Sequence, residues 1–364
     1  MITRELQPGE RIRVMVVDDS VVIRRIVTRA LEQDPAIEVV GSASNGLLGL
    51  QRIPQLNPDV LTLDIEMPDM DGLEMLRRIR QEYPSLRVIM FSSLTERGAA
   101  VTLEALTLGA EDYVTKSFSE ASREDSMARL KNEMIPKIRQ FFRFPRQSDE
   151  AKSTPDLPVR TGPRATQCAP PQERPRVVVI GISTGGPTAL GSILPSLPAG
   201  FPLPILIVQH MPPLFTRFLA ERLNSRCALN VREAVEGDVV EPGAILLAPG
   251  DFHMKVIADQ AKVSVLLDQS SQQNFCRPAV DVLFRSVGEV YGGAVLGVVL
   301  TGMGQDGLRG VEVLKARGAR ILAQDEATSV IWGMPGAVVK AGLADYVLPL
   351  DAVIPEIVRM AGRN

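Results

Sequence analysis

The 364-residue chain is poor in the residues that most metal centres and disulfide scaffolds need, with two histidines and three cysteines. The cysteines are widely spaced and form no CxxC pair, so we expect neither a zinc site nor a disulfide framework. No apolar run reaches the roughly 18 residues that a bilayer requires, and the first residues contain no hydrophobic signal stretch. These absences predict a cytoplasmic protein with reduced thiols and no membrane insertion.

The chain also lacks an excess of basic charge. Its net charge is −3 and its pI is about 5.7, which disfavours a nucleic-acid partner, and no helix-turn-helix pattern is visible. Apolar residues make up 45% and charged residues 23%, a balance typical of folded globular chains. Because 364 residues exceed what one core usually organises, two domains are expected.

The first part of the chain, residues 11–143, alternates short apolar runs with amphipathic segments. This order predicts an α/β domain with a five-stranded parallel sheet covered by helices. Pro54 is expected to shorten or kink the second helix, and Pro136 to kink or split a final helix over residues 122–142.

Residues 144–175 are rich in proline and small polar residues, which predicts an extended linker. A second α/β pattern follows over residues 176–364. It predicts a doubly wound, mainly parallel α/β domain, and closely spaced turns between residues 231 and 268 indicate a β-hairpin portion.

Polar side chains follow several predicted strands of the first domain. Asp18 and Asp19 end the first strand, Asp64 the third, Ser92 the fourth and Lys116 the fifth. Because the carboxyl ends of parallel strands share one edge of the sheet, these side chains are expected to converge. Clustered carboxylates suit Mg²⁺, which neutralises an incoming phosphoryl group.

The motifs VVDDS, LDIEMPDMDG, FSSLT and VTKS resemble the response-regulator receiver domain of two-component signalling, which has a flavodoxin-like fold. The resemblance implies that Asp64 accepts the phosphoryl group and that Asp18, Asp19 and Asp64 hold Mg²⁺. It also implies that Ser92 and Lys116 form the phosphoryl switch. Serine replaces the usual proline after this lysine, which puts the switch geometry in question.

A second candidate site begins at GISTGG, residues 181–186, where glycines surround Ser183 on a predicted strand-to-helix turn. Such a turn either binds a phosphate group or exposes a nucleophile, and the motif alone leaves both interpretations open. His210 follows another predicted strand, and Asp306 follows a third. The three side chains are therefore expected to converge as nucleophile, base and orienting acid. Their chain order differs from that of α/β-hydrolases, so another fold is expected.

The segments GISTGGP, QHMPPLFTRFLAERL, LAPGDFHM and LTGMGQDG resemble the catalytic domain of the chemotaxis protein-glutamate methylesterases and glutamine deamidases. The resemblance implies that Ser183 is the nucleophile, His210 the general base and acid, and Asp306 the orienting residue. Thr184 and Met303 flank the site as oxyanion or substrate-positioning groups.

Three further residues are interpreted as structural. His253 is expected to be a hydrogen-bonded framework residue, Cys276 a small buried side chain, and Trp332 a packing residue near the sheet edge.

The resemblance covers both domains in their order. It implies a cytoplasmic hydrolase, activated by phosphorylation, that removes methyl groups from glutamate γ-methyl esters of chemoreceptors and deamidates receptor glutamines. A chemotaxis histidine kinase would be the phosphodonor, and hydrolysis would need no cofactor. The alternative is a phosphorylation-gated regulator that binds a ligand or partner without hydrolase activity.

Overall fold

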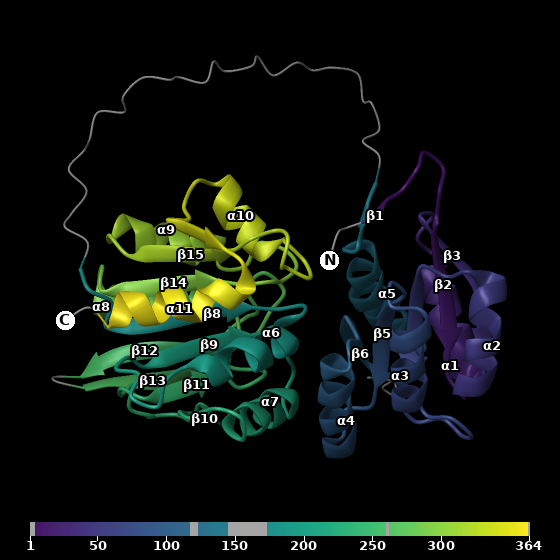
Figure 1. Cartoon of the computed structure of the whole chain (residues 1–364), viewed down its shortest axis with the longest axis horizontal. Coiled ribbons are helices and arrows are strands. Elements are labelled where there is room, and N and C mark those ends of the chain that lie inside the picture. Colours follow the sequence, from purple (N-terminus) through teal and green to yellow (C-terminus); the bar gives the residue numbers. More distant parts are fainter. Residues whose placement is uncertain (1–3, 117–122, 145–172, 260–261, 363–364) are drawn as a thin grey trace, which may run out of the picture.

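The computed structural model describes residues 4–116, 123–144, 173–259 and 262–362, and most of the predicted linker lies outside these ranges. The first domain has a five-stranded parallel sheet in the order β3-β2-β4-β5-β6 (Figure 1). Its strands are β2 (Ile12–Val17), β3 (Ile37–Ala43), β4 (Val60–Asp64), β5 (Arg87–Ser92) and β6 (Asp112–Thr115). Its helices are α1 (Val21–Leu31), α2 (Gly46–Leu56), α3 (Gly72–Glu82), α4 (Glu96–Thr107) and α5 (Arg123–Arg139).

Both prolines lie inside helices. Pro54 lies in the last turn of α2, which continues to Leu56, and α5 runs through Pro136 without splitting. The predicted end of α5 is wrong: the helix ends at Arg139, and the following chain forms β7 (Phe142–Arg143). This strand pairs in parallel with the unpredicted β1 (Arg4–Glu5), because the buried Phe142 packs into the receiver core rather than extending the helix.

The second domain contains a seven-stranded, wholly parallel sheet in the order β10-β11-β9-β8-β14-β15-β16. These strands are β8 (Val177–Ile182), β9 (Ile205–Gln209), β10 (Asn230–Glu233), β11 (Ala244–Leu247), β14 (Val295–Val299), β15 (Arg320–Gln324) and β16 (Tyr346–Leu348). The antiparallel hairpin β12 (His253–Asp259) and β13 (Lys262–Asp268) confirms the predicted hairpin portion, whereas β10 and β11 join the parallel sheet.

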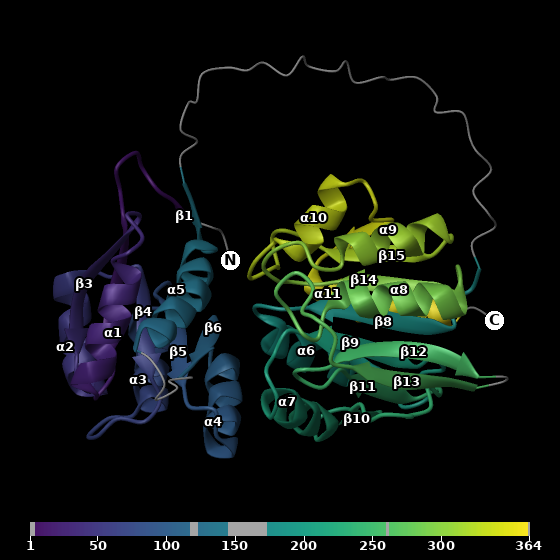
Figure 2. The same ribbon diagram turned by 180° about the vertical axis from the view of Figure 1, so that it is seen from behind.

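Helices cover both faces of this sheet (Figures 1 and 2). They are α6 (Gly186–Ile193), α7 (Phe215–Asn224), α8 (Val280–Tyr291), α9 (Leu308–Ala316), α10 (Met334–Lys340) and α11 (Leu350–Ala361), with a short 3₁₀ turn η1 (Leu194–Ser196). Alternate residues of β8 face two different cores: Val178 and Ile180 pack with α6, α7 and α11, and Val177 and Val179 with α8 and α9. A strand buried on both faces explains its continuous apolar run.

The first and second domains are in contact. Helix α4 packs against α6 and α7, and the ring of Tyr113 stacks on Phe215 with 4.8 Å between centroids and an angle of 5°. The Thr188 hydroxyl donates a 2.9 Å hydrogen bond to the Leu106 carbonyl, and Arg217 pairs with Glu96 at 2.5 Å. None of the helices formed by the described residues combines the length and apolarity needed to cross a bilayer.

Candidate functional sites

The predicted acidic cluster forms at the carboxyl edge of the receiver sheet. Ligand oxygens of Asp18, Asp19 and Asp64 all lie within 4.8 Å of one another. Lys116 Nζ lies 2.7 Å from Asp64 Oδ1 and 3.0 Å from Asp18 Oδ2. Burial raises the pKa of Asp64 to about 6, and the nearby Lys116 only partly offsets that effect.

The donor set fits a hard divalent cation. Asp18 is 1% exposed, and its Oδ2 pairs with Lys116 Nζ at 3.0 Å. Three carboxylates, of which Asp19 is exposed to solvent, supply the oxygen ligands that Mg²⁺ prefers.

Ser92 is placed differently from the other members of this cluster. It is fully buried, and its hydroxyl contacts the Thr102 hydroxyl at 2.6 Å and the Gly98 carbonyl at 3.2 Å, both on α4. In the described state it therefore faces the helix that packs on the catalytic domain. Ser117, the departure from the receiver pattern, lies outside the described residues.

Ser183 lies on the predicted turn between β8 and α6. Gly185 has φ +79°, a left-handed conformation that glycine adopts without strain. The Ser183 N–H donates to the Thr301 carbonyl at 2.9 Å, and the Ser183 carbonyl accepts from Gln209 Nε2 at 3.0 Å. A Cβ on Gly302 would lie 2.7 Å from Ser183 Cβ, so glycine is needed there for the loop after β14 to approach the serine.

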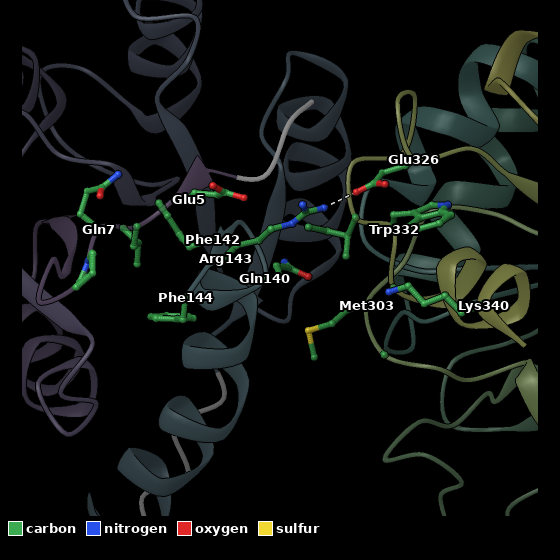
Figure 3. A pocket seen from close by; sticks show the side chains of 15 residues that line it. Glu5, Gln7, Gln140, Phe142, Arg143, Phe144, Met303, Glu326, Trp332 and Lys340 are labelled. Atoms are coloured by element: carbon green, nitrogen blue, oxygen red, sulfur yellow. Dashed lines mark hydrogen bonds and ion pairs between the residues drawn. The ribbon is translucent and has the colours of Figure 1, made fainter. Parts of the chain in front are cut away.

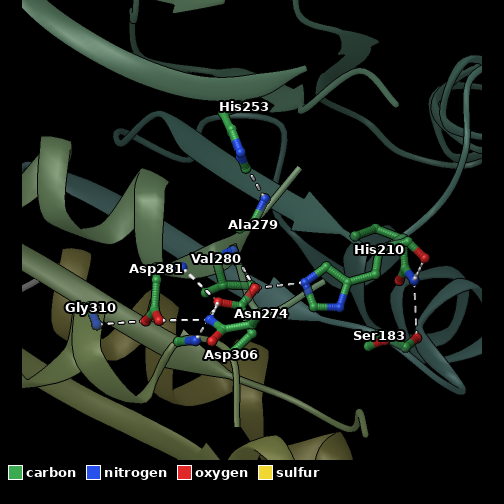
Figure 4. A network of polar contacts seen from close by, with 11 residues as sticks. Ser183, His210, His253, Asn274, Ala279, Val280, Asp281, Asp306 and Gly310 are labelled. Atoms are coloured by element: carbon green, nitrogen blue, oxygen red, sulfur yellow. Dashed lines mark hydrogen bonds and ion pairs between the residues drawn. The ribbon is translucent and has the colours of Figure 1, made fainter. Parts of the chain in front are cut away.

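His210 and Asp306 meet at the same edge, as predicted (Figure 4). His210 follows β9, and its Nε2 lies 2.8 Å from Asp306 Oδ2. The same Oδ2 accepts the Val280 N–H at 2.6 Å, while Oδ1 accepts the N–H groups of Asp281 at 3.1 Å and Gly307 at 3.0 Å. Sheet order reverses between β8 and β14, the usual location of a site in such folds.

Burial and neighbouring charges act in opposite directions on the pKa values of His210 and Asp306. Burial opposes ionisation of Asp306, but His210 and the backbone N–H donors together hold its pKa below the ordinary value. Burial would likewise lower the pKa of His210, but interactions with Cys276 and Asp306 outweigh it and raise that pKa. The Nε2–H of His210 therefore faces an ionised carboxylate, and general-base catalysis would use Nδ1 of the neutral imidazole, which forms only as the pH rises through the raised pKa.

Two residues at this site were not identified from the sequence. Asn274 Nδ2 donates to Asp306 Oδ1 at 2.8 Å and to Asp281 Oδ2 at 2.9 Å, bridging two buried carboxylates. Cys276 was expected to be a buried packing residue, but it is only half-buried and interacts with the His210 ring. Sequence distance concealed this contact, because residues 210 and 276 meet only through the tertiary fold.

The contact between Cys276 and His210 predicts a pH effect. A base must be neutral, so kcat/KM for ester hydrolysis should rise with pH through the raised pKa of His210, with a midpoint above 6.5. Replacing Cys276 with alanine removes an interaction that favours imidazolium, so the midpoint should move to lower pH. The measurement is the pH profile of kcat/KM on a small glutamate γ-methyl ester; an unchanged or higher midpoint in Cys276→Ala would contradict the prediction.

Thr184, next to Ser183 in the chain, and Met303, next to Gly302, lie in different environments. The Thr184 hydroxyl donates a 2.9 Å hydrogen bond to Asp112 Oδ2 of the receiver, and the residue is 8% exposed. Met303 is 40% exposed and lines an interdomain cavity of about 920 Å³, shown in Figure 3 with Phe142 and Trp332 on its walls.

His253 and Trp332 have structural contacts. His253 is fully buried, its Nδ1 accepts the Ala279 N–H at 3.2 Å, and its Nε2 lies 3.2 Å from the Ser271 carbonyl, as expected of a framework residue. Trp332 Nε1 donates to the Gln324 carbonyl at 2.9 Å at the end of β15.

A receiver sheet with an acidic pocket, joined to a parallel sheet with a serine, an imidazole and a carboxylate at one edge, defines a response regulator with a hydrolase-type output domain. Residues 14–127 match the response regulator receiver domain, and residues 178–357 match the CheB methylesterase family.

The chain is 49% identical over 352 residues to a protein-glutamate methylesterase/protein-glutamine glutaminase of Trichodesmium erythraeum, covering 97% of this chain and 99% of that one. A Nocardioides protein of the same name is 49% identical, covering 98% and 97%. The crystal structure of the Thermotoga maritima CheB methylesterase catalytic domain matches with a TM-score of 0.50 and 46% identity, covering 51% of this chain and 98% of that chain. The chain belongs to the CheB methylesterase family.

Proposed function

We propose that this chain hydrolyses glutamate γ-methyl esters and deamidates glutamines on chemoreceptors during chemotaxis adaptation, under control of receiver phosphorylation. The observation that carries the proposal is the His210–Asp306 pair, 2.8 Å apart, beside the turn that presents Ser183 at the sheet's switch point. Phosphate binding alone would need neither a base nor an acid to orient it.

In the first half of the reaction, Ser183 Oγ attacks the γ-carbonyl carbon of the substrate while His210 Nδ1 takes the hydroxyl proton. Asp306 stabilises the resulting imidazolium through Nε2. Collapse of the tetrahedral intermediate breaks the bond to methoxide or amide, which leaves as methanol or ammonia after accepting the proton from His210. In the second half, water attacks the γ-glutamyl ester of Ser183 by the same proton route.

Thr184 and Met303 are proposed to position the substrate or stabilise the oxyanion. Thr184 directly follows Ser183 in the chain, and Met303 follows Gly302, the glycine that packs against Ser183, and lines the interdomain cavity. Since Thr184 is engaged by Asp112, the receiver competes directly with substrate for a residue adjacent to the nucleophile.

The receiver would be phosphorylated on Asp64 by a chemotaxis histidine kinase. Asp18, Asp19 and Asp64 would hold Mg²⁺, which supplies charge neutralisation for the incoming phosphoryl group. Lys116 pairs with Asp64, and Ser92 contacts α4. Both residues are therefore positioned to respond to phosphorylation of Asp64. We propose no cofactor for hydrolysis, a cytoplasmic location, and domains at 11–143 and 176–364 joined by a linker over 144–175.

Active-site labelling separates the hydrolase from a binding-only regulator. A fluorophosphonate reacts with an activated serine, so we expect covalent labelling of the wild-type protein and its loss in Ser183→Ala. Persistence of labelling in that variant would remove Ser183 from the nucleophile role, and a wild-type protein that never reacts would favour the binding regulator.

Substitution of Asp64 tests the regulatory half of the proposal. Asp64→Asn keeps the side-chain shape but cannot form the acyl phosphate, so basal hydrolysis should persist while stimulation by a small phosphodonor disappears. The assay is methanol release with and without phosphodonor, with Asp19→Asn as a companion that weakens metal binding and leaves the acceptor in place. Undiminished acid-labile phosphate in Asp64→Asn, detected by mass spectrometry, would refute the assignment.

A further inference from the structure

Phe275 is the most exposed large apolar side chain among the described residues. Its relative exposure is 96%, whereas the next highest value, for Val22, is 59%. Phenylalanine is one of the residues most often buried in folded proteins, so a ring almost entirely in water is an unusual arrangement that contributes little to folding.

The backbone at this position is also unfavourable for phenylalanine. Asn274 and Phe275 have φ values of +52° and +62°, and the flanking residues exchange two hydrogen bonds, Cys276 N–H to the Gln273 carbonyl at 2.9 Å and the reverse at 3.1 Å. This is a two-residue hairpin turn with both central residues left-handed, where asparagine and glycine are preferred. Asparagine satisfies that preference at 274, but a bulky aromatic at 275 does not.

The turn is firmly attached to the hydrolase site. Asn274 donates to Asp306 and to Asp281, and Cys276 interacts with His210. Arg277, the next residue, pairs with Asp251 and donates to the Gln269 and Ser270 carbonyls, each at 2.9 Å. Both neighbours of Phe275 thus interact with members of the proposed triad, so the exposed ring is carried by a turn that is fixed to the site. Strain and exposure concentrated at one position beside a site indicate a functional contact.

The geometry points to Phe275 as a substrate-docking residue: its ring packs on apolar side chains of the protein segment that carries the modified glutamate. This inference rests on the proposed function. A glutamate side chain is short, so Ser183 reaches its γ-carbonyl only if the substrate backbone comes close to the rim of the site. An exposed aromatic ring at this position becomes buried only when a macromolecular substrate binds. A small ester does not contact it.

The inference is tested by comparing two substrates. For Phe275→Ala we expect kcat/KM on methylated receptor membranes to fall at least tenfold, mainly through KM, and kcat/KM on a small N-acetyl glutamate γ-methyl ester to stay within twofold of wild type. Phe275→Trp should restore most of the receptor activity. Ile257→Ala, which truncates an exposed apolar side chain on β12, is the matched control and should leave both substrates unaffected.

Phe275→Asn adds a stability readout. Asparagine tolerates the left-handed conformation, so this variant should melt at or above the wild-type temperature while losing receptor activity as Phe275→Ala does. Receptor kcat/KM within twofold of wild type in Phe275→Ala, or equal losses on both substrates, would overturn the docking role. A wild-type protein inactive on both substrates would instead overturn the proposed function.

Discussion

Alanine at Ser183 or His210 should each remove nearly all ester hydrolysis, a loss of roughly 10⁴-fold or more in kcat. Ser183 is proposed to supply the attacking oxygen and His210, the imidazole paired with Asp306, the base, so neither step of the reaction survives without both. Because the two groups act as a unit, the double variant should be hardly slower than either single one. The measurement is methanol release under saturating substrate, with folding verified by circular dichroism.

Asp306→Asn should cause a smaller loss than either alanine variant, since the amide still occupies the site while its charge no longer stabilises imidazolium. His253→Ala is the control for histidine identity, because the His253 ring hydrogen-bonds to the backbone at Ala279 and Ser271 and not to Asp306. If that variant abolished hydrolysis in a folded protein while His210→Ala remained active, the base would have been assigned to the wrong residue.

Removing residues 1–175 should raise hydrolysis of methylated receptor at least roughly tenfold above the unphosphorylated full-length protein. The receiver holds Thr184 through Asp112 in a charge-assisted hydrogen bond, a class of contact that contributes about 1.5–3 kcal/mol, and about 1.4 kcal/mol corresponds to a factor of ten. The stacked Tyr113 and Phe215 rings add apolar contact, whereas the exposed Arg217–Glu96 pair contributes little.

The fragment from Arg176 retains every strand of the parallel sheet and all three proposed triad residues, so it should fold alone. Asp112→Asn in the full-length chain gives a milder comparison. It keeps an acceptor for the Tyr113 N–H but weakens the bond from Thr184, so activity should rise by less than in the fragment. A folded fragment no faster than its unphosphorylated parent would contradict restraint by the receiver.

The meeting of the acidic side chains, and that of His210 with Asp306, could be anticipated because strand ends are visible in the sequence. Asp64 ends a mainly apolar strand and His210 follows another, and parallel strands bring their carboxyl ends to one edge. The same logic fails for Asn274, which lies in a turn without an apolar strand before it. Its role depends on two carboxylates 7 and 32 positions away in the chain, and no local pattern encodes that meeting.

Interdomain contacts were equally inaccessible to sequence reasoning. The sequence predicts that Asp112 is the polar first residue of a strand. Nothing in DYVTK indicates that its carboxylate accepts a hydrogen bond from Thr184, 72 residues further along the chain. The small β1–β7 sheet was missed for a related reason: two-residue strands carry no periodicity, and Phe142 continued an apparently helical pattern.

Methanol release from methylated receptor membranes, measured with and without a small phosphodonor, tests the central claim most directly. Wild-type protein should release methanol slowly and accelerate when the phosphodonor is added, Asp64→Asn should release it at the basal rate in both conditions, and Ser183→Ala should release none. Methanol release that is equal in Ser183→Ala and wild type, or acceleration that persists in Asp64→Asn, would contradict a serine methylesterase controlled by its receiver.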